Sequence, residues 1–386
     1  MDRWTGPAWV GVVGGLLLFA ALFLPAVVWQ SRRYGRLSVL RLIGTAALAV
    51  YGTALVAYTL LPLPSGDLAL WCAEHGVGGA QLHPFQFVAD IRRDTAGMSL
   101  AATLRSAAVL QVVFNVLLFL PWGIFARGFA GWGVLRSTLT GALASLAIEV
   151  TQFTGVFGLI GCSYRVGDVD DLMTNTLGAL LGALAAPLVL RWMPRPADLA
   201  RDRGAPRPVS TLRRWLGMLV DVVSVLVLGT ALGIGWGLAG HLIDGREIAA
   251  PALVSTWFPA AVLLWLPPLV GSGASLGQRA MWLEPRWRSA SGELVRGSLP
   301  RRALRGFCGA AGWGLLSALN GTGLALVIFV AATVLAVPFS RGHRGLSYIL
   351  TGAELVDARV TPGARTSTAE PDHSPGPGPA PATGRP

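Results

Sequence analysis

The sequence predicts an all-α polytopic membrane protein with eight or nine transmembrane helices arranged in two units. Of the 386 residues, 53% are hydrophobic and only 13% are charged, and the mean hydropathy is +0.57. Soluble domains carry about 25% charged residues. The chain also contains repeated apolar runs of about 18 residues or more, which is the length that a membrane-spanning helix needs. Arginine-rich connections separate these runs.

The apolar runs define the predicted spans. The first run, Trp9 to Trp29, is too long for the core of a signal peptide and is followed by basic residues, so we expect an uncleaved span. Asn320-Gly321 interrupts the last run, which is either one tilted helix or a hairpin of two. The predicted spans cover residues 8–30, 40–62, 108–129, 133–155, 172–193, 215–240, 252–270 and 303–338.

Arginine placement predicts the orientation, because basic residues concentrate in cytoplasmic loops. The odd-numbered connections hold most of the arginines, for example Arg32, Arg33 and Arg36 in the first. We therefore predict a multi-pass protein of the cytoplasmic membrane with its N-terminus outside. The same distribution accounts for the net charge of +11, and no nucleic-acid partner is predicted because no motif for one is present. The sequence gives no indication of the oligomeric state.

A Pro- and Arg-rich segment divides the chain. The prediction is a five-span membrane domain at 1–193, a cytoplasmic linker at 194–212, a second membrane domain at 213–358 and a disordered tail at 359–386. Within the second domain, residues 279–305 interleave arginines with tryptophans. This composition favours a helix that lies in the inner membrane interface.

The stretch SYRVGDVDDLMTNTLG, residues 163–178, places three aspartates directly before the fifth span. Its helical spacing puts acidic and amide side chains on one face, above Gly178 and Gly182, a pair of small residues that lets a neighbouring helix approach closely. Ionisable residues at membrane depth are candidates for function. We predict a polar pocket at the outer face, formed by the third, fourth and fifth spans. Its predicted ligand-binding residues are Asn115, Glu149, Gln152, Arg165, Asp168, Asp171 and Asn175.

Purely structural roles are the alternative for these residues. Asp168 can cap the helix that follows it, and acidic residues at a helix N-terminus stabilise it by about 0.3–1 kcal/mol. Glu149 can pair with Arg165. Cys72 and Cys162 both fall in predicted outer loops, where disulfides form; we expect two unlinked thiols, with a disulfide as the alternative.

Four blocks within residues 40–190 resemble the VanZ-like family. They are HPF (His83 to Phe85), N-x-x-x-F-x-P-x-G (from Asn115), I-E-x-x-Q (from Ile148) and R-x-x-D-x-D-D-x-x-x-N-x-x-G-x-x-x-G (from Arg165). The resemblance implies a bacterial cell-envelope protein associated with resistance to the antibiotic teicoplanin and related lipoglycopeptides. It implies no particular reaction.

Residues 210–358 resemble an RDD domain. The resemblance rests on Arg214 and Asp221 in RWLGMLVD, followed by SLGQR, RRALR and RGLSYILTGAELVD. Where such domains carry His-Asp, this chain has Ser347-Tyr348. The resemblance implies cation or proton transport, with Arg214 and Asp221 as the candidate ion site; a simple Arg214–Asp221 ion pair is the structural alternative.

Three functions follow from these observations. The leading one is binding of a lipid-linked or lipoglycopeptide-type molecule, or of a membrane lipid, in the outer pocket. The second is enzymatic action on a lipid-linked envelope precursor, with Glu149 or Asp168 as the catalytic base; three carboxylates, from Asp168, Asp170 and Asp171, can hold a divalent cation, and no other cofactor is expected. The third is ion transport through the second domain.

Overall fold

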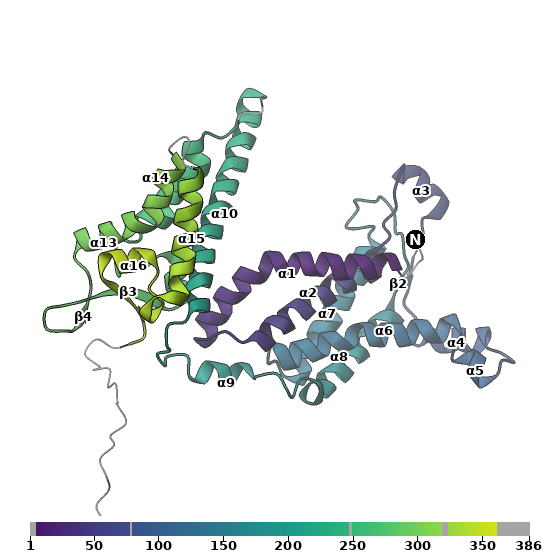
Figure 1. Cartoon of the computed structure of the whole chain (residues 1–386). Coiled ribbons are helices and arrows are strands. Elements are labelled where there is room, and N and C mark those ends of the chain that lie inside the picture. Colours follow the sequence, from purple (N-terminus) through teal and green to yellow (C-terminus); the bar gives the residue numbers. More distant parts are fainter. Residues whose placement is uncertain (1–4, 78, 247–248, 319–322, 361–386) are drawn as a thin grey trace, which may run out of the picture. The chain divides into compact units, whose positions relative to one another are not determined.

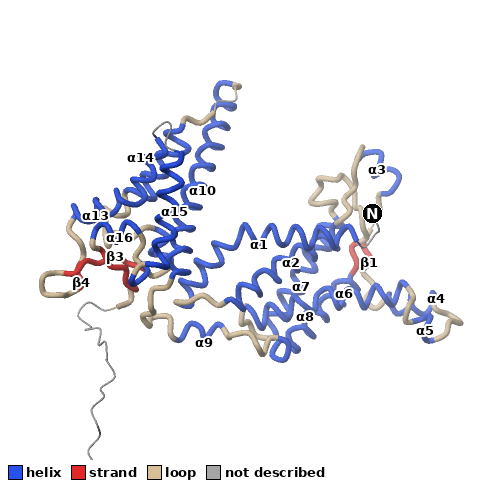
Figure 2. Tube along the Cα trace, viewed as in Figure 1, coloured by secondary structure: helices blue, strands red, loops and turns tan. Residues whose placement is uncertain are grey.

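The computed structural model describes residues 5–77, 79–246, 249–318 and 323–360. The chain forms two compact units, residues 1–205 and 206–386 (Figure 1). Both units are mainly helical, with a few short strands (Figure 2). The predicted interruption at Asn320-Gly321 lies outside the described residues, and so does most of the predicted tail.

Long helices dominate unit 1. They are α1 (Thr5–Tyr34), α2 (Val39–Leu60), α6 (Ala107–Ile124), α7 (Val134–Phe153) and α8 (Val169–Val189), and α6 continues into a π-helical turn, Phe125–Phe129. Short elements connect them: α3 (Leu68–His75), β1 (Ala80–Gln81), α4 (Gln86–Asp94), α5 (Leu100–Thr103) and β2 (Gly167–Asp168). The short helix α9 (Pro196–Arg201) follows α8.

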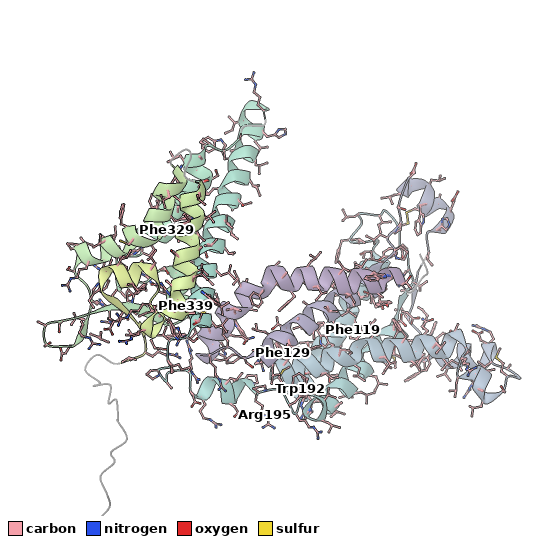
Figure 3. All side chains as sticks on the ribbon, viewed as in Figure 1. Phe119, Phe129, Trp192, Arg195, Phe329 and Phe339 are labelled. Carbon is pink, nitrogen blue, oxygen red and sulfur yellow. A yellow bond between two sulfur atoms is a disulfide. The ribbon has the colours of Figure 1, made fainter. Side chains whose placement is uncertain are left out.

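Glycines allow close helix packing in unit 1. A Cβ atom at Gly178 or Gly182 of α8 would clash with a backbone carbonyl oxygen of α6, so the predicted small-residue pair is confirmed and its partner is α6. Gly15 of α1 likewise faces the backbone of Val50 in α2. Phe119 of α6 is fully buried in this unit (Figure 3).

Five helices among the described residues are long and apolar enough to cross a membrane, namely α1, α2, α6 with its π-helical turn, α8 and α10. Two shorter apolar helices cover 253–265 and 323–339. The predicted fourth span forms α7, whose 20 residues carry several hydroxyl groups and Glu149, so it is less apolar than the others. The total of eight or nine spans stays a prediction.

Unit 2 begins with the 34-residue helix α10 (Thr211–Asp244), which Ser210 caps and which ends at Gly245 in a left-handed conformation. The other helices are α11 (Phe258–Ala260), α12 (Leu276–Ala280), α13 (Leu299–Gly306), α14 (Gly312–Ala318), α15 (Gly323–Phe339) and α16 (Leu346–Thr351), with π-helical turns at Leu253–Trp257, Ala261–Trp265 and Phe307–Ala311 and a 3₁₀ turn at Arg341–His343.

A three-stranded sheet corrects the prediction of an interfacial helix over 279–305. Strand β3 (Leu283–Arg288) lies between β4 (Leu294–Val295) and β5 (Ala353–Asp357), and both pairings are antiparallel. Five consecutive pairs join β3 to β5, from Leu283↔Asp357 to Trp287↔Ala353. The segment becomes a strand because a partner about 70 residues away satisfies its backbone groups. Only residues at its two ends, in α12 and α13, are helical.

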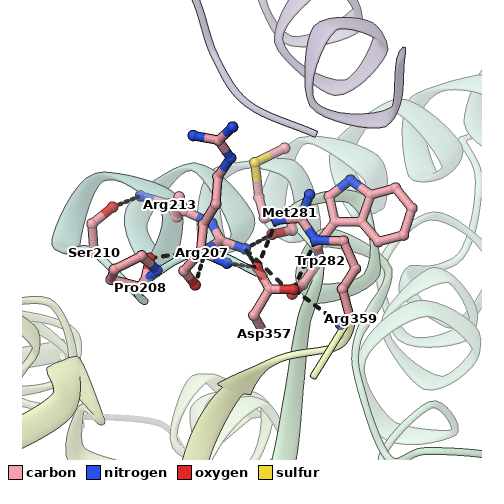
Figure 4. A network of polar contacts seen from close by, with 8 residues as sticks. All are labelled: Arg207, Pro208, Ser210, Arg213, Met281, Trp282, Asp357 and Arg359. Carbon is pink, nitrogen blue, oxygen red and sulfur yellow. Dashed lines mark hydrogen bonds and ion pairs between the residues drawn. The ribbon is translucent and has the colours of Figure 1, made fainter. Parts of the chain in front are cut away.

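Asp357 fastens the end of β5 to the start of α10 (Figure 4). Its carboxylate accepts hydrogen bonds from Arg213 at 2.9 Å and from Arg359 at 2.7 Å, and from the backbone N–H of Arg207 at 3.2 Å. Burial favours the neutral acid, but the bonds from Arg359 and Arg213 outweigh it and hold the pKa of Asp357 below its ordinary value.

Candidate functional site

The acidic segment lies where the N-terminus of α8 meets β1, α4 and α6. Parallel pairing of β1 with β2 sets Gln81 opposite Asp168. The Asp168 side chain accepts a hydrogen bond from the Asp170 backbone N–H at 2.8 Å, as a helix N-cap does. The capping role given above as an alternative for Asp168 is therefore confirmed.

Asp170 holds the loop that carries the HPF block. Its two carboxylate oxygens accept hydrogen bonds from the backbone N–H of Phe85 at 2.6 Å and of Phe87 at 2.8 Å. Asp170 is only 5% exposed. The contact fixes the start of α4 against the start of α8, although 83 residues separate Phe87 from Asp170.

Asp171 is the third aspartate at the start of α8, after Asp168 and Asp170. Asn115 of α6 donates a hydrogen bond to one of its oxygens at 2.5 Å. The three aspartates, with Asp90 of α4, line a cavity of about 70 Å³. We call this cavity the collar pocket; its other lining residues are Phe87, Ala108, Gln111, Val112 and Thr174.

The collar pocket is electronegative. None of its described lining residues is basic, although Asp90 forms an exposed ion pair with Arg93 at 3.0 Å. Burial raises the pKa of Asp168, and the neighbouring carboxylates of Asp170 and Asp90 raise this pKa further. A cation that entered the pocket would relieve this repulsion.

Three predicted site residues of helices α7 and α8 form hydrogen bonds with other parts of unit 1. Glu149 accepts a hydrogen bond from the Asp168 backbone N–H at 2.9 Å. Gln152 donates to the Thr59 carbonyl oxygen of α2 at 2.6 Å. Asn175 donates to the Ser145 hydroxyl at 2.9 Å, and its own carbonyl oxygen is buried without a partner in the protein.

Arg165 does not line the collar pocket. Its side chain is exposed and donates to the Leu61 carbonyl oxygen at 3.4 Å. Within the described ranges no ion pair joins it to Glu149, so the alternative pairing of these two residues is wrong. The Glu149 carboxylate instead accepts a hydrogen bond from the backbone N–H of Asp168.

The predicted site omitted Asp90 and Gln111. Asp90 lies in QFVADIRRD, an amphipathic helix in a connection that the hydropathy pattern leaves as a loop. Gln111 lies four residues before Asn115 on α6, so it shares a helix face with a predicted site residue. That spacing was the available signal for Gln111. No local signal identifies Asp90, because only the loop that Asp170 fixes brings it there.

A disulfide joins Cys72 to Cys162 across 90 residues of sequence. The expectation of two unlinked thiols is therefore wrong. The bond ties α3 to the loop that precedes β2, and the Val77 backbone N–H reinforces it by donating to the Ser163 carbonyl oxygen at 3.0 Å. The Val77–Ser163 hydrogen bond and the pairing of β1 with β2 bring the segments that carry the two cysteines together.

In unit 2, Asp221 does not form the expected ion pair with Arg214 within the described residues. Its carboxylate accepts hydrogen bonds from the Ser275 hydroxyl at 2.6 Å and from the Gly277 backbone N–H at 2.7 Å. Arg214 instead places its guanidinium 4.5 Å from the centroid of the Tyr348 ring. The N-terminus of α12, at its N-cap Ser275 and at Gly277, supplies donors that lie closer to Asp221 than the arginine does.

The described residues contain no group of three or more His, Cys, Asp or Glu side chains arranged to hold a metal ion. Asp168, Asp170 and Asp171 point their oxygens to separate donors from the backbone and from Asn115. The divalent cation at these residues stays a prediction.

Residues 48–190 match the family model described as VanZ/LLP1. The matched segment contains the collar pocket and all seven predicted ligand-binding residues. The match is consistent with a membrane protein linked to antibiotic resistance. Because the match ends at residue 190, the resemblance of the second unit to an RDD domain stays a prediction. No curated protein and no solved structure matches the chain.

Proposed function

We propose that the collar pocket binds a cationic group, such as a protonated amine, on the polar head of a lipid-linked or lipoglycopeptide-type molecule of the cell envelope. One observation carries the proposal: four aspartates from two segments line a single small cavity without a basic residue among its described lining. At an effective dielectric constant of about 20, one unit charge about 4 Å away is worth about 4 kcal/mol. Several carboxylates therefore favour a cation strongly over an anion.

The size of the cavity limits what can enter. Pockets for drug-sized ligands measure about 300–1,000 Å³, so a cavity of about 70 Å³ admits a small charged group and not a whole envelope molecule. The remainder of the ligand would lie against the surrounding surface.

Exposed apolar residues surround the pocket segment and suit a lipid tail. Leu82, Phe85, Leu100 and Leu104 all lie in the connection between α3 and α6, which Asp170 contacts at Phe85 and Phe87, and Leu82 and Leu100 are 72% and 75% exposed. Contiguous exposed apolar patches mark ligand or membrane sites, and we propose that these side chains form such a patch beside the pocket. This pattern supports a ligand that has both a cationic head and a hydrophobic part.

The disulfide supports an outward-facing pocket. Disulfides persist in oxidising compartments and are rare in the cytosol. Because the Cys72–Cys162 disulfide joins α3 to the loop that leads into β2 and Asp168, the pocket would face the outer side of the membrane, where a lipoglycopeptide arrives.

Binding to the purified full-length chain tests the proposal. Teicoplanin, teicoplanin with its free amine acetylated and vancomycin would be titrated against wild type, Asp90→Asn, Asp171→Asn and the control Asp94→Asn, which lies on the same helix as Asp90 outside the pocket. Loss of one charge-assisted contact should weaken binding of teicoplanin about tenfold. Acetylation should weaken it similarly, and the control should bind as wild type does.

The cellular test measures the susceptibility to teicoplanin of a host that lacks its own copy of this protein and expresses the same variants. The level of each variant in the membrane is measured by blot. Protection by wild type and the control, lost in both pocket variants at equal abundance, would support the proposal. Equal binding of acetylated and unmodified teicoplanin would refute the cationic pocket. Recovery of chemically altered ligand would favour the enzymatic alternative at Glu149 or Asp168.

A further inference from the structure

A second and larger cavity lies in unit 2 and is independent of the collar pocket. Its volume is about 420 Å³, within the range of small-molecule sites. One part of its lining is polar: Arg214, Asp221, Ser275, Gln278, Arg305 and Ser347. The rest is apolar and comes mainly from α10 and from α15, on which Phe329 lies (Figure 3).

The polar end carries a net positive charge. Arg214 and Arg305 are each only 5% exposed, and one carboxylate, Asp221, accompanies the two guanidinium groups. The two oxygens of Asp221 accept hydrogen bonds from Ser275 and Gly277, and among the described residues the acid forms no direct ion pair with either arginine. Two buried cations and one anion leave a charge of +1.

Tyr348 connects the two arginines without neutralising them. Arg305 donates to the Tyr348 hydroxyl at 3.1 Å and to the Gly273 carbonyl oxygen. Both guanidinium groups lie over the tyrosine ring, at 4.5 Å for Arg214 and 5.1 Å for Arg305. The Nε atoms of both arginines are buried without a hydrogen-bond partner in the protein. A desolvated positive charge of this kind is costly unless an anion accompanies it.

The apolar end opens on the surface of the helices. Val222 and Leu226 of α10 line the cavity and are 52% and 61% exposed, and Val330 and Val334 line it from α15. An apolar chain can therefore enter between these side chains while its head reaches the arginines. We propose that this cavity binds one membrane phospholipid with an anionic head group, the phosphate on Arg214 and Arg305 and an acyl chain along α10 and α15.

Charge complementarity selects this occupant. A phosphate oxygen accepts charge-assisted hydrogen bonds from guanidinium groups, frequently two at once. A zwitterionic lipid would bring its own cation to a site that already holds a positive charge. A free phosphate would leave the apolar part of the lining without a partner.

Native mass spectrometry of the full chain in neutral detergent tests the proposal. The protein would be mixed with equal amounts of phosphatidylglycerol and phosphatidylcholine that carry identical palmitoyl and oleoyl chains. We expect one bound phosphatidylglycerol, favoured about tenfold or more, which corresponds to about 1.4 kcal/mol. Equal binding of the two lipids would overturn the proposal. Displacement of the lipid by millimolar sodium phosphate would show an anion site rather than a lipid site.

Two variants and one control locate the site. Arg305→Gln should reduce the preference for phosphatidylglycerol about tenfold, and Arg301→Gln, which removes an exposed charge from the same helix, should leave it unchanged. Because Arg305 also holds Tyr348 and Gly273, a second variant, Val222→Trp, fills the apolar end and leaves the polar cluster intact. Unchanged lipid binding by Val222→Trp would overturn the proposal even if Arg305→Gln does not fold.

Discussion

Removal of the Asp170 carboxylate should release the HPF loop from α8. Asp170 accepts two backbone hydrogen bonds, from Phe85 at 2.6 Å and Phe87 at 2.8 Å, and is nearly fully buried. Hydrogen bonds to a charged group contribute about 1.5–3 kcal/mol each. Asp170→Ala should therefore lower the free energy of local opening by about 3 kcal/mol or more, which corresponds to roughly hundredfold faster exchange of these two amides.

Hydrogen–deuterium exchange of peptides that cover residues 84–90 measures this effect. Asp170→Asn keeps one carbonyl oxygen as an acceptor, so its exchange should be only about tenfold faster. The control Asp94→Asn changes an exposed aspartate at the end of α4, so the Phe85 and Phe87 amides should exchange at the wild-type rate in this variant. The reasoning is refuted if the Phe85 and Phe87 amides exchange at wild-type rates in folded Asp170→Ala. Equal acceleration in α10 would also refute it, because the effect would then not be local.

Three further predictions follow from the packing and the ionic contacts. Gly182→Ala inserts a methyl group against the backbone of α6 and should lower stability by about 1–3 kcal/mol, whereas Gly235→Ala, which has open space around its Cβ, should not; thermal unfolding in detergent compares the two. Asp357→Asn should cost about 2 kcal/mol at pH 7. Because the folded-state pKa of Asp357 is lowered, the stabilisation that its carboxylate provides is present above the unfolded pKa of about 3.9 and is lost as the pH falls through the folded pKa. The difference in unfolding temperature between wild type and Asp357→Asn should therefore shrink below about pH 4. A difference that stays constant with pH would refute the ionic account. Cys72→Ser should free Cys162, so a membrane-impermeant maleimide should label the variant in intact cells and leave wild type unlabelled at this position; no labelling in the variant would contradict an outward-facing collar.

Local patterns determined the helices. The long apolar runs gave α1, α2, α6, α8 and α10 close to their predicted bounds, because a helix satisfies its backbone hydrogen bonds within one segment. The start of α8 was equally local, since the N-cap bond of Asp168 spans only two residues. Most of the polar residues around the collar pocket could be predicted from the sequence because they lie close together on α8 or at helical spacing on α6.

Only the tertiary structure decided which of these residues act together. Asp170 binds a loop more than 80 residues earlier, and Cys72 meets Cys162. Arg41 is buried with its guanidinium over the Phe129 ring at 4.4 Å. Strand β3 likewise depends on β5, about 70 residues later. Periodicity and composition report the environment of a single segment. Contacts between distant segments depend instead on how the helices pack, so the collar pocket, the disulfide and the sheet could not be read from the sequence alone.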